Sequence, residues 1–163
     1  MLSSSRGFAL IEALVVLGLI GILLTIGYPY YQVFMQNASY RSAAREVASV
    51  MRQARAEAAT RNREHQVKFD FKENSYLLRR GNRVRGSDDW ARVTGERTLS
   101  SLVDLRAWDG NQCVASPDSL ILNFFPDGTT NHTAGICILN RAGERRFLVQ
   151  LTSRATGHVT VGR

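Results

Sequence analysis

The sequence of 163 residues contains few of the side chains from which catalytic and metal sites are built. It has two cysteines and three widely separated histidines, and no Cys-x-x-Cys pair, so a four-ligand zinc site has no candidate set. Glycine-rich phosphate loops and a Gly-x-Ser-x-Gly element are also absent. Asp88 and Asp89 are adjacent but lack further acidic residues at a cation-binding spacing, and we expect them to belong to a loop. We therefore predict no catalytic residues, no metal, no cofactor and no enzymatic activity.

Lysine is nearly absent as well, because Lys68 and Lys72 are the only two among 21 basic residues. The formal net charge is +7 and arginine carries almost all of the positive charge. Arginine binds phosphates and carboxylates through a planar fork, so a nucleic acid or an anionic surface is an admissible partner. A net charge of this size more often only keeps a protein soluble. The composition alone therefore does not indicate an anionic partner.

The sequence has no charged residue in the apolar stretch from Ala13 to Tyr31, and the next charged residue is Arg41. Nineteen residues of helix span roughly 28 Å, close to the ~30 Å hydrocarbon core of a membrane. A cleavable secretory signal with a cleavage site at Thr25-Ile26-Gly27 is the alternative, but the run is longer than such a signal needs. Glu12 also interrupts its start, at a cost of about 2.5–3.5 kcal/mol near a bilayer interior. We expect a partner that neutralises this carboxylate.

The segment Gly7-Phe8-Ala9-Leu10-Ile11-Glu12 resembles the class III signal of type IV prepilins and type II secretion pseudopilins. The resemblance implies that a membrane peptidase removes residues 1–7 by cutting between Gly7 and Phe8, and that the new amino group of Phe8 is methylated. Glu12 then becomes the fifth mature residue, and Pro29 stands at mature position 22, where the family often has proline. In the family, the glutamate recruits subunits into the filament.

The physical chemistry of these positions agrees with that role. Cleavage creates a cationic amine on Phe8, and Glu12 is the complementary anion about one helical turn away. Between staggered chains in a filament core the two charges can pair, although desolvation limits the net gain. Pro29 removes a backbone donor and is expected to bend or locally melt the helix, and Gly27 weakens it further. The alternative is that Pro29 ends the membrane helix.

From Asn37 to about Thr60 the helical pattern continues but becomes amphipathic. Its apolar positions recur at three- and four-residue spacing: Tyr40, Ala43, Ala44, Val47, Val50, Met51, Ala54 and Ala58. We expect residues 8–36 to form the transmembrane and filament-core helix, and residues 37–64 to pack on a head. Together they would make one helix of about 53 residues, roughly 80 Å long. The segment Gln53–Asn62 resembles the helix end of the GspH/FimT-like minor pilins and pseudopilins, with a generic alanine-rich helix as the alternative.

Beyond Glu64 the period changes to two, which predicts a β-rich head over residues 65–163. Val67, Phe69 and Phe71 share one face of a strand that pairs through a turn with residues 75–78, followed by a basic loop over residues 79–89. Further strands are predicted at 98–105, 119–125, 135–140, 145–152 and 158–161. Pro126-Asp127-Gly128 is a turn, and residues 125–129 resemble a motif of the same branch. The expected fold class is α+β, a long N-terminal helix packed against an antiparallel sheet.

Cys113 and Cys137 both follow the membrane segment. If the head is outside the cytoplasm, a disulfide between them is the default, and closing a loop of this size is worth about 3 kcal/mol; two buried thiols are the alternative. We expect a single-pass protein of the bacterial inner membrane with its head in the periplasm. The count of basic residues on the two sides argues weakly against that orientation, but long translocated domains follow this rule poorly.

The resemblance predicts a minor pilin or minor pseudopilin, built into a thin filament or placed at its tip. Its expected partners are other pilin or pseudopilin subunits, the prepilin peptidase, the inner-membrane assembly platform, and the membrane before assembly. The alternative is a DNA receptor, since some FimT-like proteins bind DNA through a C-terminal Gly-Arg-x-Arg motif. Here Gly157-His158-Val159-Thr160 lacks both arginines. The basic residues that could still line a phosphate-binding face are Arg141, Arg145, Arg146, Arg154 and Arg163.

Overall fold

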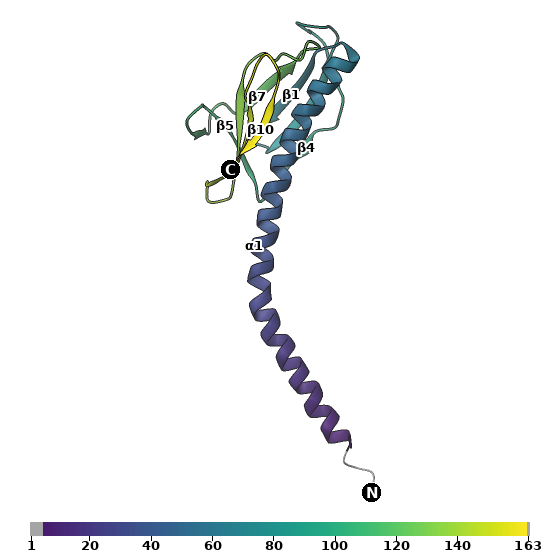
Figure 1. The fold of residues 1–163 in the computed structure, drawn as a ribbon, viewed down its shortest axis with the longest axis vertical. Helices are drawn as coiled ribbons and strands as arrows, with labels where there is room; N and C mark the ends of the chain where they lie inside the picture. Colours follow the sequence, from purple (N-terminus) through teal and green to yellow (C-terminus); the bar gives the residue numbers. More distant parts are fainter. Residues whose placement is uncertain (1–4, 163) are drawn as a thin grey trace. The chain divides into compact units, whose positions relative to one another are not determined.

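A computed structural model describes residues 5–162 of the protein, with side chains from Ile11 onward. The chain forms two compact units, Met1–Ala38 and Ser39–Arg163. One helix, α1 (Ser5–Arg61), is followed by strands only (Figure 1). The strands are β1 (His65–Asp70), β2 (Ser75–Gly81), β3 (Trp90–Arg92), β4 (Arg97–Thr98), β5 (Asp104–Trp108), β6 (Cys113–Val114), β7 (Ser119–Phe124), β8 (Ala134–Leu139), β9 (Arg145–Leu151) and β10 (Val159–Gly162).

In the first unit, α1 exposes its large apolar side chains from Ile11 to Met35. Within the described residues, α1 is the one helix long and apolar enough to cross a membrane. Pro29 lies inside the helix, so the alternative in which it ends the helix is wrong. Proline removes a single backbone donor, and the turns on both sides retain their own hydrogen bonds. The apolar surface therefore continues without interruption past this residue.

In the second unit, the predicted apolar stripe of α1 is buried, from Tyr40 at 6% exposure to Ala58 at 0%. Its many alanines let the helix approach the strands closely, because a methyl group adds little thickness. Glu57 pairs with Arg61 one turn later, at 3.3 Å between Oε2 and Nε. The helix ends where Asn62 adopts a left-handed conformation with φ 49°, a common way to stop a helix.

The strands form two antiparallel sheets rather than one. The first has the order β3-β2-β1-β7 with β4 beside β2, and the second has the order β10-β9-β8-β5-β6. The predicted hairpin is confirmed, with Val67 opposite Leu78 and Phe69 opposite Tyr76. Asn74 occupies its turn with φ 48°.

Two predictions about the strands need correction. The strand predicted at 98–105 is two strands, because a turn closed by Val103 N–H donating to Ser100 O separates β4 in the first sheet from β5 in the second. The basic loop predicted at 79–89 begins only after Gly81. Arg79 and Arg80 belong to β2 and pair with β3, which the sequence analysis did not predict.

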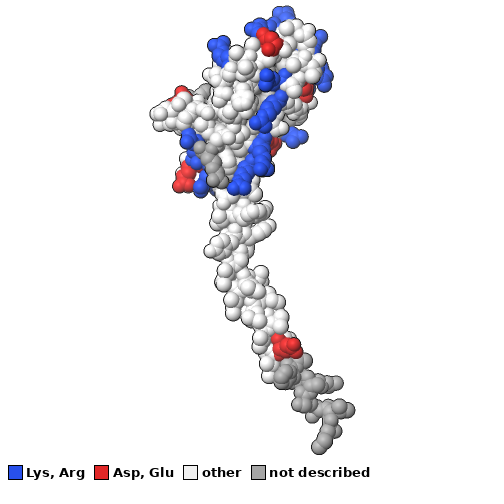
Figure 2. Space-filling view, viewed as in Figure 1, with Lys and Arg blue, Asp and Glu red and all other residues white. Residues whose placement is uncertain are grey.

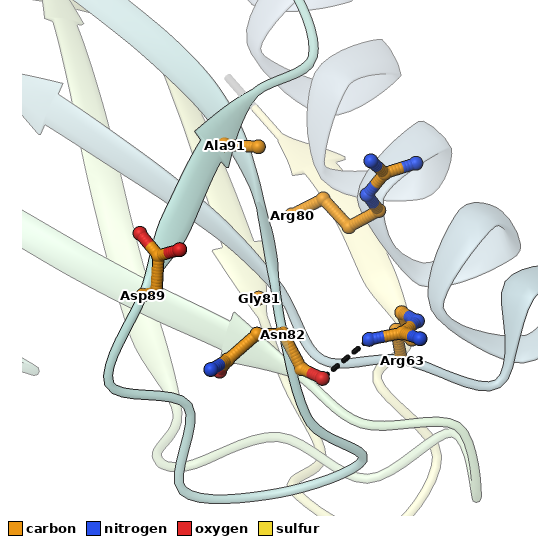
Figure 3. Close-up of a pocket in the computed structure, with 6 residues that line it drawn as sticks. All are labelled: Arg63, Arg80, Gly81, Asn82, Asp89 and Ala91. Carbon is orange, nitrogen blue, oxygen red and sulfur yellow. Dashed lines mark hydrogen bonds between the residues drawn. The ribbon is translucent and has the colours of Figure 1, made fainter.

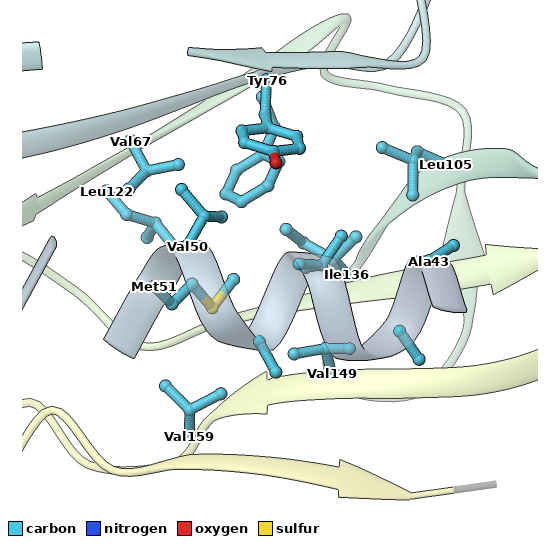
Figure 4. Close-up of a cluster of buried hydrophobic side chains, with 14 of the residues drawn as sticks. Ala43, Val50, Met51, Val67, Tyr76, Leu105, Leu122, Ile136, Val149 and Val159 are labelled. Atoms are coloured by element: carbon cyan, nitrogen blue, oxygen red, sulfur yellow. The ribbon is translucent and has the colours of Figure 1, made fainter. Parts of the chain in front are cut away.

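One core joins the helix and both sheets (Figure 4). Met51 comes from α1, Phe69 and Leu122 from the first sheet, and Ile136 and Val149 from the second, and all five are fully buried. This core consists of residues from Tyr40 to Val159. The head therefore has a hydrophobic core of its own.

Candidate functional site

Glu12 lies on α1 among exposed apolar side chains. Ile11, Leu14 and Val15 beside it are each more than half exposed, and in Figure 2 this stretch is uncharged apart from an acidic group. In the described part of the chain, Glu12 belongs to none of the ion pairs. A carboxylate on an apolar surface is costly once that surface leaves water, unless a cation compensates it. The cation must come from outside the described part of the chain.

The other predicted positions of the N-terminal signal are placed less fully. The backbone of Gly7 and Phe8 belongs to α1, but their side chains are outside those that the structure describes. Peptidase cleavage between them and methylation of Phe8 therefore stay predictions. Pro29 lies within α1, and its role in assembly also stays a prediction.

Cys113 and Cys137 form the predicted disulfide, with their Cα atoms 6.0 Å apart. Cys113 is on β6 and Cys137 on β8, and both strands pair with β5, which lies between them. The bridge thus ties the two-residue strand β6 to the fully buried Cys137. The alternative of two free thiols is wrong.

We expect replacement of both cysteines by serine to lower the free energy of unfolding by about 3 kcal/mol, because the unfolded chain regains the freedom of the open loop. Urea denaturation of oxidised protein and of the double variant measures the difference. Wild-type protein under a reductant is the matched control and should unfold with the variant. Equal stability of the oxidised protein and the variant would contradict the prediction.

The arginines predicted as a DNA-binding face do not form one group. Arg145 stacks on the ring of Trp108 on β5, at 4.9 Å. Its neighbour Arg146 lies 5.9 Å from the ring of Tyr40 on α1. The pairing of β8 and β9 is irregular at these two residues, and their side chains contact rings on two different elements.

The other candidate arginines, Arg141, Arg154 and Arg163, do not complete a DNA-binding face either. Arg141 donates to the backbone oxygen of Ser101, and Arg146 pairs with Glu144. Arg154 lies near His132, whose pKa is lowered first by burial and second by the Arg154 charge. Arg163 is outside the described residues. DNA binding gains no support from this arrangement.

A polar hollow of about 400 Å³ opens beside the end of β2 (Figure 3). Arg63 donates to the backbone oxygen of Asn82, and Asp89 lies on the opposite side. Asp88 accepts hydrogen bonds from Asn82 and Arg83, each at 2.6 Å, and the Asn82 bond is the main reason that the pKa of Asp88 is lowered. These hydrogen bonds stabilise the loop after β2. Among the described residues, no three His, Cys, Asp or Glu side chains gather as a metal site would require.

A buried polar network that the sequence pattern did not predict lies next to this loop. Glu64 is 2% exposed, and its carboxylate accepts from the backbone of Ser87 and from Asn123, both at 2.9 Å. Gln66, also buried, donates to Asn123. His65 is fully buried next to Glu64, with Nε2 3.5 Å from Glu57. The alternating pattern gave no signal for these contacts, because the partners are far apart in the sequence.

Three comparisons with known proteins bear on this architecture. The sequence profile described as Type II transport protein GspH matches residues 43–155. The profile described as prokaryotic N-terminal methylation motif matches residues 2–28, the segment that carries Gly7, Phe8 and Glu12. No curated protein sequence matches the chain.

Among solved structures, the minor pseudopilin EpsH from the type 2 secretion system of Vibrio cholerae is similar, with a TM-score of 0.59 and 12% identity over 76% of this chain and 94% of that chain. The type IV minor pilin FimU of Pseudomonas aeruginosa has a TM-score of 0.54 and 18% identity over 76% of this chain and 92% of that chain. At these identities the likeness shows the fold, a long N-terminal helix packed on antiparallel strands.

Proposed function

The chain belongs to the family of type II transport protein GspH, and from this premise we propose that it is a minor subunit of a type IV pilus or a type II secretion pseudopilus. It enters the filament through its N-terminal helix and acts at the tip, where assembly starts. Glu12 carries this proposal, because it is a carboxylate on an exposed apolar helix and forms no ion pair with any residue whose side chain is described. The exposed apolar side chains from Ile11 to Met35 support it, because they offer a surface that can pack against other chains.

The proposal includes the route to the filament. Residues 1–7 are the leader, the prepilin peptidase cuts between Gly7 and Phe8 and methylates Phe8, and the subunit waits as a single-pass protein of the bacterial inner membrane. Its head is in the periplasm, which the Cys113–Cys137 disulfide supports, since such bonds persist in oxidising compartments. The inner-membrane assembly platform then transfers it to other pilin or pseudopilin subunits.

Antibodies to the head provide the test. They should detect the chain in filaments sheared from the cells, in far smaller amounts than the main subunit. Deletion of the chain should lower the number of filaments and leave the length and thickness of those that remain unchanged, because a tip subunit acts once per filament. The proposal fails if the chain stays in the membrane fraction while filaments assemble normally without it.

A further inference from the structure

The end of α1 and the turn after β7, two segments that carry family-like motifs, meet at one groove of the head. The groove has a volume of about 450 Å³. Its lining residues are Arg52, Arg55, Ala56 and Ala59 from the helix and Pro126, Asp127 and Gly128 from the turn. Segments about 70 positions apart in the sequence therefore build a single surface.

Two glycine turns lie next to Arg55. Gly128 has φ 81° and Gly157 has φ 56°, a conformation that glycine adopts at low cost. A Cβ on Gly157 would lie 3.2 Å from Cδ and 3.3 Å from Nε of Arg55, and one on Gly128 would lie 3.7 Å from its Nη2. A side chain at Gly157 would therefore crowd Arg55, whereas one at Gly128 would only reach ordinary contact distance.

The positive charge of the groove is not compensated within the described residues. Arg52 donates to the backbone oxygen of Val159 at 3.3 Å, and neither Arg52 nor Arg55 belongs to an ion pair. Asp127 lies at the groove, but Arg85 and Thr129 occupy its two carboxylate oxygens, at 2.9 Å and 2.7 Å. The groove is therefore lined by two exposed arginines, and none of its described lining residues offers an unpaired carboxylate.

The floor of the groove is apolar, and its basic rim extends along the helix. Ala56, Ala59 and Pro126 form the floor. At about 100° per residue, Arg41 and Arg45 fall on the same side of α1 as Arg52 and Arg55. Figure 2 shows a row of basic side chains on the head where α1 runs. The surface thus combines a row of cations with a short apolar trough.

We propose that this groove binds an acidic segment of a neighbouring subunit, with a carboxylate in the forks of Arg52 and Arg55 and an apolar side chain on the alanine and proline floor. The identity of the partner as a subunit rests on the proposed function. A bidentate arginine fork matches a carboxylate. A nucleic-acid phosphate would bind the arginines but would leave the apolar floor without a contact.

A second copy of this chain is a poor occupant. The head is strongly basic, and many of its surface carboxylates are already paired with its own bases. The paired residues are Asp88, Asp104, Asp118, Asp127 and Glu144. A second copy would also bring a net positive charge to a positively charged groove. We therefore infer that the partner is a different, more acidic subunit that presents an aspartate or glutamate next to an apolar residue.

The test uses the full chain in filament-producing cells, with the photocrosslinking residue p-benzoylphenylalanine in place of Thr60, which is exposed at the rim beside Ala56 and Ala59. We expect a crosslink to another subunit, at a peptide that contains an acidic residue next to an apolar one. Arg55→Glu and the groove-filling Ala59→Phe should each reduce its yield at least about tenfold. Reversal of the mapped carboxylate to arginine should restore the yield with Arg55→Glu.

Arg92→Glu is the matched control, because it reverses the charge of an exposed arginine on β3, which does not line the groove, and it should leave the crosslink unchanged. A crosslink to nucleic acid or lipid, a mapped peptide without a carboxylate, or failure of the charge exchange would overturn the proposal. If the probe-bearing chain is present in filaments and still gives no such crosslink, the groove proposal alone fails. Absence of the wild-type chain from filaments would instead refute the proposed function.

Discussion

A chain that carries Glu12→Gln should be processed and inserted into the membrane at the wild-type level and yet be missing from the filament. Glutamine keeps the size of the side chain and removes its charge. Among the described residues no cation pairs with Glu12. The cation that we propose for it in the filament is the amino group of Phe8 of another subunit. The variant leaves this cation unpaired in an apolar interior.

Removing one partner of a buried ion pair typically costs about 3–5 kcal/mol, which corresponds to a loss of roughly two to almost four orders of magnitude in an equilibrium constant. Quantitative immunoblots of the sheared filament and membrane fractions measure the loss. Ile11→Ala is the matched control, since it shortens the neighbouring exposed side chain without changing charge, and it should assemble nearly normally. Normal incorporation of Glu12→Gln would exclude the proposed role of this carboxylate.

The helix could be predicted from the sequence because its evidence is local. The spacing of Tyr40, Val47, Met51 and Ala58 repeats within a few turns, and all four side chains are buried as that spacing predicts. The β1–β2 hairpin was predictable for the same reason, since Asn74 turns the chain directly between its two strands. The N-terminal signal lies within six consecutive residues, which made the family recognisable.

The division into two sheets was not predictable, because alternation shows that a strand has a buried face but not which strand lies beside it. Leu105 pairs across with Ile138 of β8, and Val67 with Leu122 of β7. Both pairings close long loops that leave no local pattern. The groove at Arg55 was hidden for the same reason, since the glycine turns that lie next to its side chain come from two distant segments.

Removal of the leader by the peptidase is expected to depend on Gly7. We expect Gly7→Val to leave the chain at its full length, with the seven leader residues still attached, without a methylated Phe8, and absent from the filament. Glycine has no Cβ, so a peptidase can approach the backbone carbonyl of Gly7 closely, whereas a β-branched side chain blocks that approach. Without the cut, the amino group that would pair with Glu12 of another subunit is never formed.

Gel mobility and mass spectrometry of the N-terminal peptide distinguish the precursor from the processed, methylated chain. Gly18→Val is the matched control, because a Cβ at Gly18 would meet nothing within 4 Å, and that variant should be cut normally. If Gly7→Val still yields a shortened chain that begins at Phe8, the assigned cleavage site is wrong. If cutting is blocked but the long precursor enters the filament, the assembly step does not need the Phe8 amine, and the pairing inferred for Glu12 must involve a different cation.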